Sequence, residues 1–160
     1  IGKGLTAGTI SFGAMLTTKK VSDTISNSNI KVLMHGPTFM ANPLACSIAN
    51  AAIKELLSFD WKAKVLKIEK IFKQELEVLR EKRVVKDVRA IGSIGIVELE
   101  DDIYAEKLQE FCVKNDVWLR PFGKLFYSIV SYTIEEKELL KITNTMIKAI
   151  KYIEKKNEEK

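Results

Sequence analysis

The chain has 160 residues, of which 46% are hydrophobic and 29% are charged, as in an ordinary globular protein of one domain or slightly more. This composition excludes a disordered or collagen-like chain, and the lack of any run of about 18 apolar residues excludes a transmembrane helix. The N-terminus has no basic segment followed by an apolar one, so we expect no secretory signal peptide and a cytoplasmic location. Because the sequence starts at Ile1 and turns glycine-rich at once, we expect it to be part of a longer protein.

The net charge of +5 arises from 26 Lys and Arg residues against 21 Asp and Glu residues. An equal surplus lies within residues 62–89, where charges interleave with an apolar stripe at three- and four-residue spacing. The stripe consists of Val65, Ile68, Phe72, Leu76 and Leu79. The pattern predicts a long amphipathic helix with a solvated basic face, and that face carries no aromatic residues to stack on bases. Nucleic-acid binding is therefore only a minor alternative.

The cysteines and the single histidine limit the chemistry that the chain can carry. Cys46 and Cys112 lie far apart in helical apolar patterns, which favours two reduced core thiols over a disulfide or a metal pair. His35 is the only histidine, so a zinc site built on several imidazoles is excluded. We therefore expect no metal site.

The first 13 residues contain four of the eight glycines, which indicates tight turns or close approach of another group to the backbone. A short strand over residues 12–18 and a short helix over residues 21–26 are expected to follow. Asn42 is a preferred N-cap, and Pro43 suits the first helical position. The helix that they start should extend to about residue 59, and it is apolar enough to be buried on most sides.

From residue 61 onward, the periodicity predicts helices on one face of a mostly antiparallel sheet. Gly92 and Gly95 suggest a bulge in the second strand, and Thr133 with Glu136 fits a capping box. The expected elements are helices over residues 61–82 and 103–115, strands over residues 84–90, 91–99 and 125–130, an extended segment over residues 117–120, and a last helix with the stripe Leu139, Thr143, Met146, Ile150 and Ile153. We therefore expect a small α+β domain over residues 61–160, whereas residues 1–60 complete a larger domain.

Lys3 lies between two glycines in the stretch GKGLTAG of residues 2–8. A lysine in such a loop is, by itself, more often a surface residue, and the spacing of a phosphate-binding P-loop is absent. The functional alternative is a lysine that holds an aldehyde cofactor as a Schiff base and shuttles protons. The flanking glycines would leave room for that cofactor.

Two motifs in the right order resemble the class III family of pyridoxal-phosphate-dependent aminotransferases. Residues 3–8, KGLTAG, are similar to the family's cofactor-lysine loop, and residues 38–46, TFMANPLAC, are similar to its phosphate-contacting segment. The resemblance extends along essentially the whole chain but covers only the C-terminal part of the family's length. It implies the α/β fold of the fold type I transferases, with residues 1–60 at the end of the large cofactor-binding domain and residues 61–160 as the small domain.

Carried over residue by residue, the resemblance implies pyridoxal 5'-phosphate as the cofactor and Lys3 as the residue that binds it and carries protons at its C4′ atom. It implies that Thr38 contacts the cofactor phosphate from the neighbouring subunit of a homodimer. Pro37 would shape that contact, and Gly36 would lie against the substrate. A hydroxyl near a helix start does suit an anion. From the residues alone, a plain turn before a capped helix remains the alternative.

Arg120 is singled out by its surroundings. The chain has 22 lysines and only four arginines, and Arg120 is the one outside residues 80–89. It lies among Trp118, Leu119, Pro121 and Phe122, where a guanidinium must find an anion, and its planar fork suits a carboxylate. The resemblance implies that this anion is the carboxylate of the substrate. A structural ion pair to a glutamate is the alternative.

The chain departs from the family pattern at Ala7 and Ala41, where glycine is common. The family's glycine-serine phosphate loop, its aromatic ring stacked on the cofactor and its aspartate at the pyridine nitrogen belong to the part upstream of this match. The implied activity is transfer of an amino group between small molecules, with no role for nucleic acid or membrane. The alternatives are a related transaminase that acts on an ω-amino acid, and a non-catalytic fragment that binds no cofactor.

Overall fold

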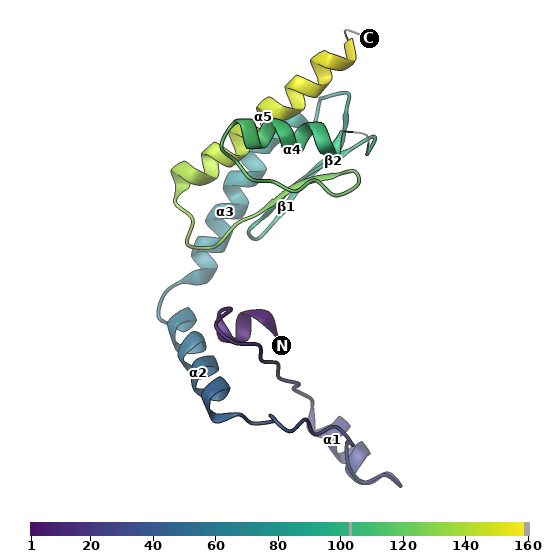
Figure 1. Ribbon diagram of the computed structural model, residues 1–160, viewed down its shortest axis with the longest axis vertical. Coiled ribbons are helices and arrows are strands. Elements are labelled where there is room, and N and C mark those ends of the chain that lie inside the picture. The colour runs from purple at the N-terminus through teal and green to yellow at the C-terminus, as the bar shows by residue number, and fades with distance from the viewer. Residues whose placement is uncertain (103, 159–160) are drawn as a thin grey trace. The chain divides into compact units, whose positions relative to one another are not determined.

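The computed structural model describes residues 1–102 and 104–158 of the chain. The chain divides into two compact units, which comprise residues 1–59 and 60–160. The second unit contains a sheet with helices packed against it, whereas the first contains helices joined by turns and extended segments (Figure 1).

Helix α3 (Trp61–Leu76) opens the second unit. Oδ1 of Asp60 accepts a hydrogen bond from the backbone N–H of Ala63 at 2.9 Å, which satisfies one of the free N–H groups at the helix start. The helix ends earlier than the sequence predicts, and one 3₁₀ turn, η2 (Glu77–Leu79), follows it. The predicted apolar stripe is confirmed, with Ile68, Phe72, Leu76 and Leu79 buried and Val65 half-buried.

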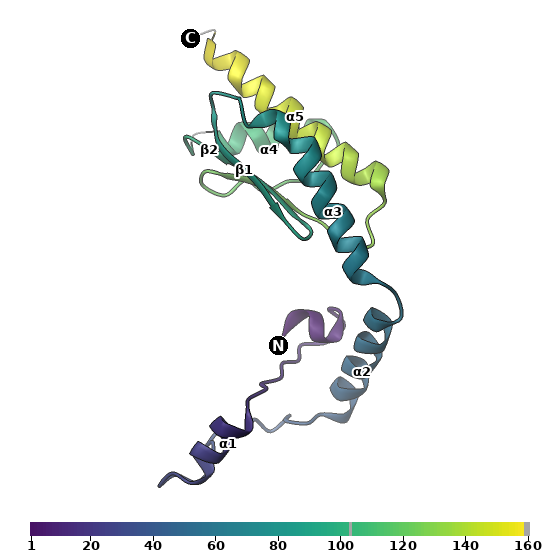
Figure 2. The same cartoon turned by 180° about the vertical axis from the view of Figure 1, so that it is seen from behind.

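The sheet has three strands in the order β1 (Val85–Ile91), β2 (Ile94–Leu99) and β3 (Leu125–Ile129). Both ladders, β1 with β2 and β2 with β3, are antiparallel. The sequence-based expectation of an antiparallel sheet with helices on one face is confirmed, as two opposite views show (Figures 1 and 2).

Gly92 and Gly95 do not form the bulge that the sequence suggested. Gly92 turns the chain between β1 and β2 with a φ of +55°. A Cβ at Gly95 would lie 2.3 Å from the ring of Phe72, so the absent side chain lets α3 pack closely on the sheet. The register shifts instead between Val85 and Asp87.

Two further helices complete the second unit. Helix α4 (Ala105–Lys114) accounts for most of the helix expected over residues 103–115, of which residue 103 lies outside the described residues. Helix α5 (Glu136–Glu158) packs against both α3 and α4. All five residues of its predicted stripe are buried, which confirms the face that the sequence assigned to the core.

The start of α5 differs from the predicted capping box of Thr133 and Glu136. The hydroxyl of Thr133 lies 2.7 Å from the hydroxyl of Ser131. The backbone N–H of Glu135 donates instead to the carboxylate of Glu138 at 3.3 Å, so the helix is capped two residues later than expected.

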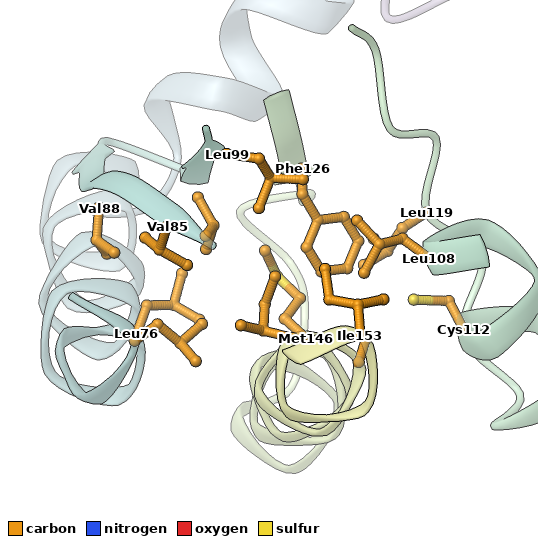
Figure 3. Packing of buried hydrophobic residues seen from close by; sticks show 14 of the residues in the cluster. Leu76, Val85, Val88, Leu99, Leu108, Cys112, Leu119, Phe126, Met146 and Ile153 are labelled. Atoms are coloured by element: carbon orange, nitrogen blue, oxygen red, sulfur yellow. The ribbon is translucent and has the colours of Figure 1, made fainter. Parts of the chain in front are cut away.

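The hydrophobic core lies between the sheet and the three helices, as Figure 3 shows. Leu99 and Phe126 point from the strands toward Met146 and Ile153 of α5. Cys112 of α4 is fully buried here, and burial raises the pKa of its thiol to about 11. The thiol is therefore protonated at neutral pH, in agreement with a reduced core cysteine.

The first unit contains the short 3₁₀ helix η1 (Lys3–Thr6) and the helices α1 (Lys19–Ser26) and α2 (Pro43–Leu57). The strand expected over residues 12–18 is wrong, since this segment is irregular and the only sheet among the described residues lies in the second unit.

Helix α2 begins as the sequence predicts but is less buried than expected. Oδ1 of Asn42 accepts a hydrogen bond from the backbone N–H of Ala45 at 3.0 Å. Ala45 and Ala49, four residues apart on one face, are the buried residues of this helix, and η1 packs against it. Leu44 and Leu57 are exposed, so the expectation of burial on most sides is wrong within this unit.

Candidate functional site

Lys3 lies in a loop whose backbone adopts unusual conformations. The φ angle is +45° at Lys3, +49° at Ala7 and +78° at Gly8. This left-handed region is unfavourable for a residue with a Cβ, so the surroundings must hold the lysine there. Backbone strain of this kind clusters at functional sites, which makes Lys3 a candidate on geometric grounds.

The side chain of Lys3 is exposed and lines a hollow on the first unit. Within the described part of the chain, its Nζ forms no hydrogen bond or ion pair. The other lining residues are Gly4, Gly8, Ile10, Ser11 and Phe12. A Cβ at Gly4 would meet no atom within 4 Å, so this chain's own packing does not require glycine there. The hollow therefore offers an unpaired amine and open space beside it.

Residues 37–42 form two consecutive turns before α2. The N–H of Met40 donates to the carbonyl of Pro37 at 2.9 Å, and the N–H of Asn42 donates to the carbonyl of Phe39 at 3.2 Å. Thr38 is exposed, and its hydroxyl has no hydrogen-bond partner among residues 1–102 and 104–158. The hydroxyl is therefore available to an external acceptor.

Gly36 precedes these turns and also has open surroundings. A Cβ built on it would meet nothing within 4 Å, and its φ lies outside the left-handed region. Neither conformation nor packing within this chain requires glycine at this position. Close approach of a group from outside would supply a reason for it.

Arg120 lies in an extended segment that is anchored at alternate residues. Val117 and Leu119 are buried, whereas Trp118 and Arg120 are exposed. A turn follows, in which Phe122 and Leu125 exchange two backbone hydrogen bonds of 2.9 Å. The side chain of Arg120 lines a shallow depression beside β3, together with Trp118, Tyr127, Ile129 and Ile142 among others.

The guanidinium of Arg120 has no ion-pair partner in the part of the chain that the structure describes. Arg80, by contrast, pairs with Asp87 at 2.9 Å, and this hydrogen bond is the main cause that raises the pKa of Arg80. Arg89 pairs with Glu98 at 2.7 Å, which raises the pKa of Arg89 in the same way. The structural ion pair considered for Arg120 is thus not formed within these residues, and its donors remain available to an anion.

The candidate residues divide between the two units. Lys3, Gly36, Pro37 and Thr38 belong to the first, and Arg120 belongs to the second. Among the described residues, no hydrogen bond joins the loop of Lys3 to residues 36–38.

Thr6 lies in the same loop as Lys3 and was not singled out from the sequence. Its side chain is 1% exposed, and its hydroxyl donates to the carbonyl of Ile10 at 2.5 Å. No sequence signal separates Thr6 from Thr9, which lies in the same loop but is exposed. Only the packing of the loop distinguishes them.

The described residues carry neither a metal-binding cluster nor a membrane-spanning helix. No group of three or more His, Cys, Asp or Glu side chains in them could hold a metal ion. None of the described helices is both long and apolar enough to span a membrane.

Comparison with known families gives a match over residues 1–150 to the model of Aminotransferase class-III. The chain belongs to the class III aminotransferase family. The match includes both the loop of Lys3 and the segment with Arg120, so both units are part of the family's sequence.

Relatives in this family include adenosylmethionine-8-amino-7-oxononanoate aminotransferases. The chain is 45% identical over 150 residues to that of Buchnera aphidicola subsp. Acyrthosiphon pisum, covering 94% of this chain and 35% of the relative. It is 38% identical over 152 residues to that of Corynebacterium glutamicum, covering 94% of this chain and 36% of the relative. The chain thus spans about a third of the length of the curated relatives that it matches.

Solved structures confirm the fold that the family resemblance implied. The chain resembles the adenosylmethionine-8-amino-7-oxononanoate aminotransferase of Methanocaldococcus jannaschii with a TM-score of 0.81 and 28% identity, over 94% of this chain and 37% of the other. It resembles the ornithine aminotransferase of Toxoplasma gondii with a TM-score of 0.82 and 25% identity, over 98% and 37% of the two chains. The α/β fold is therefore that of the pyridoxal-phosphate-dependent transaminases.

Proposed function

We propose that the complete protein transfers the amino group of S-adenosylmethionine, through pyridoxal 5'-phosphate, to 8-amino-7-oxononanoate. The product would be 7,8-diaminononanoate, an intermediate of biotin synthesis. The names and identities of the relatives support this reaction. The observation in the structure that carries it is Lys3, a strained residue whose unpaired amine opens onto a glycine-lined hollow.

The residues of the hollow fit a pyridoxal phosphate group. An aldehyde cofactor needs an amine that is not tied up in a salt bridge, and Lys3 meets this condition within the described residues. It also needs room at the backbone, which Gly4 leaves open. The cofactor would supply the electron withdrawal that stabilises negative charge at the substrate carbon.

Lys3 would act as both anchor and acid-base group. Its Nζ would hold the cofactor covalently when no substrate is bound. With substrate bound, the same amine would take a proton from the substrate carbon and return it at the cofactor's C4′ atom. A lysine suits this task because its flexible four-carbon side chain lets one amine reach both the substrate carbon and the C4′ atom.

Thr38 would bind the phosphate of the cofactor, Pro37 would shape that contact, and Gly36 would lie against the substrate. The free hydroxyl of Thr38 and the open surroundings of Gly36 support these roles. As the family resemblance implies, we propose that these residues act at the site of the neighbouring subunit in a homodimer.

Arg120 would bind the carboxylate of the keto-acid substrate. Its planar fork can donate two parallel hydrogen bonds to a carboxylate, and none of its donors is paired among the described residues. In the complete enzyme, residues 1–60 would end the large cofactor-binding domain and residues 61–160 would form the small domain. A transaminase of the same class that acts on an ω-amino acid is the alternative function.

The decisive experiment is to find where the cofactor is attached. Borohydride reduction of the purified complete protein with bound cofactor, followed by peptide mass analysis, should place a pyridoxyl group on Lys3. The substitution Lys3→Ala should abolish both the adduct and the visible absorption band of the bound cofactor.

Lys31→Ala is a matched control. Lys31 is also exposed and left-handed, with a φ of +60°, but it does not line the hollow. This variant should keep the absorption band. An adduct on Lys31 or on another lysine would contradict the assignment of Lys3, and a purified complete protein that converts only ω-amino acids would favour the alternative function.

A further inference from the structure

Thr6 is a buried polar residue in a unit that buries very little. Among residues 1–59, all of which are described, only Thr6, Ala45 and Ala49 are buried. Its hydroxyl donates to the carbonyl of Ile10 at 2.5 Å, and its own carbonyl accepts a hydrogen bond from the N–H of Thr9 at 3.0 Å. Thr6 thus holds the loop through two hydrogen bonds, one to Ile10 and one to Thr9.

Thr6 also lies where the loop packs on helix α2. It is the last residue of η1, which contacts α2, and the buried face of α2 carries the small residues Ala45 and Ala49. Small side chains let the backbone of η1 approach the helix closely. Thr6 therefore lies between η1, which packs on α2, and the turn that follows η1.

Ile10, which accepts the hydrogen bond from Thr6, forms part of the wall of the Lys3 hollow. Ile10 lines that hollow, as does Gly8, which lies inside the turn that Thr6 closes. Lys3 begins the same four-residue 3₁₀ helix that ends at Thr6. A change in the Thr6 hydrogen bond would therefore move the wall and the amine relative to each other.

We propose that Thr6 is a positioning residue that holds the strained Lys3 backbone and the Ile10 wall in register, so that the Lys3 amine is aimed into the hollow. This inference rests on the proposed function, because it takes Lys3 to be the residue that binds the cofactor. Thr6 does not touch the cofactor itself.

The test compares Thr6→Val with Thr6→Ser in the complete protein. Valine keeps the shape of threonine and loses the hydroxyl, whereas serine keeps the hydroxyl. Loss of one buried hydrogen bond corresponds to roughly a 5-fold to 30-fold change in an equilibrium or rate. Thr6→Val should therefore release pyridoxal phosphate roughly 5-fold to 30-fold faster than the unsubstituted protein. It should also shift the pH at which the absorption band of the Lys3-bound cofactor titrates.

Thr6→Ser should restore both properties to within about twofold of the unsubstituted protein, since the bond to Ile10 can form again. Thr9→Val is the matched control, because it makes the same chemical change three residues away at an exposed side chain. It should leave the release rate and the titration unchanged. If Thr6→Val does not fold, Thr6→Ala takes its place with the same expectation.

Two results would overturn the inference. One is a Thr6→Val protein with a lower melting temperature but an unchanged band titration and release rate, which would make Thr6 merely structural. The other is equal behaviour of Thr6→Val and Thr9→Val. In both cases a pyridoxyl adduct on Lys3 would leave the proposed function intact, whereas an unsubstituted protein with no adduct on Lys3 would refute the proposed function itself.

Discussion

The two units of the chain differ in what holds their residues in place. Among the described residues of 60–160, a cluster of twenty buried hydrophobic residues joins the sheet to α3, α4 and α5. In residues 1–59, two alanines and Thr6 are the buried residues, and large apolar side chains such as Met34 and Phe39 are exposed. The second unit is therefore shaped by burial, whereas the first is shaped by its turns and by local backbone conformation.

Backbone strain shows the opposite distribution. Of the five described non-glycine residues with positive φ, four lie in the first unit, at Lys3, Ala7, Lys31 and Ala41. Strain of this kind clusters at functional sites, and Lys3 is the residue to which we propose to assign the chemistry. The comparison indicates that burial stabilises the second unit and that the first unit carries most of the strained backbone.

The largest expected effect tests the core of the second unit. Phe72→Ala removes a fully buried ring and leaves a cavity beside Gly95, so it should lower the free energy of unfolding by about 3 to 5 kcal/mol. Urea unfolding of the 160-residue chain, followed by far-ultraviolet circular dichroism, measures this change. Leu66→Ala on the same helix is the control, because Leu66 is exposed and its loss should change stability by less than about 0.5 kcal/mol. Equal effects of the two substitutions would mean that α3 does not pack as the structure shows.

The second prediction concerns Arg120, which lies in the stable unit but has an exposed side chain. Loss of a bidentate contact to a carboxylate costs about 2 to 4 kcal/mol, so Arg120→Ala should lower kcat/KM for the keto acid by roughly 30-fold to 1000-fold. Stability of the 160-residue chain should change little, because Arg120 has no ion pair within the described residues. Arg120→Lys should recover only part of the activity, since an ammonium cannot reproduce the planar fork.

Single-turnover kinetics of the complete enzyme in its amino form provide the measurement. The keto acid is compared with an analogue whose carboxylate is replaced by a neutral amide. If Arg120→Ala slows both acceptors equally, the arginine does not recognise the carboxylate and its role is structural.

The sequence predicted the second unit more accurately than the first, for a physical reason. Burial imposes a period on the sequence, so the faces carrying Phe72 and Met146 could be assigned correctly. The strand expected over residues 12–18 had no such support, because whether an extended segment pairs depends on a neighbouring strand. Helix α2 is less buried within this unit than the sequence predicted. The prediction failed because an apolar composition does not identify which element, if any, covers each face of a helix.

The candidate site follows the same division. The glycines around Lys3 marked the loop in the sequence, but the left-handed backbone and the burial of Thr6 could be learned only from the structure. Arg120 could be proposed from its apolar neighbours, whereas its lack of a partner among the described residues could not. The assignment of all five site residues to a shared cofactor and substrate stays a prediction.

A smaller effect is expected at an ion pair that ties the end of α5 to the segment before β1. Glu154 accepts a hydrogen bond from the backbone N–H of Arg83 at 3.0 Å and pairs with Lys82 at 2.8 Å. Burial alone would raise the pKa of its carboxyl, but the contacts with Lys82 and Arg83 outweigh burial and lower it. The carboxylate therefore stabilises the fold above its unfolded pKa, and this contribution is lost as the pH falls through the folded pKa.

Glu154→Gln should thus lower stability by about 1 kcal/mol at neutral pH. The difference in free energy of unfolding between this variant and the unsubstituted chain should shrink as the pH falls below the ordinary pKa range of a glutamate. Urea unfolding of the 160-residue chain between neutral and acid pH measures it. Glu110→Gln, at an exposed carboxylate 3.9 Å from Lys114, is the control and should change the free energy of unfolding by less than about 0.5 kcal/mol at neutral pH. A difference that grows with acidification would contradict the lowered pKa.

The smallest expected effect is a gain of stability in the first unit. Ala7 and Ala41 have left-handed φ angles of +49° and +57°, and both stand where glycine is common in the family. Left-handed geometry costs an alanine about 1 to 2 kcal/mol, and part of this strain is offset because glycine loses more entropy on folding. Ala7→Gly and Ala41→Gly should therefore each stabilise their loop by about 0.5 to 1 kcal/mol.

Hydrogen exchange of the complete protein, read by mass spectrometry over residues 3–10 and 36–42, should show opening that is roughly twofold to fivefold less frequent in the glycine variants. Ala51→Gly is the matched control, because Ala51 is exposed in the interior of α2, where glycine destabilises a helix by about 1 kcal/mol. It should increase exchange in α2 instead. If alanine-to-glycine substitution slows exchange in the two loops but speeds it in α2, backbone conformation rather than side-chain packing sets the stability of this unit. Faster exchange in both loop variants would instead show that the left-handed alanines are not strained.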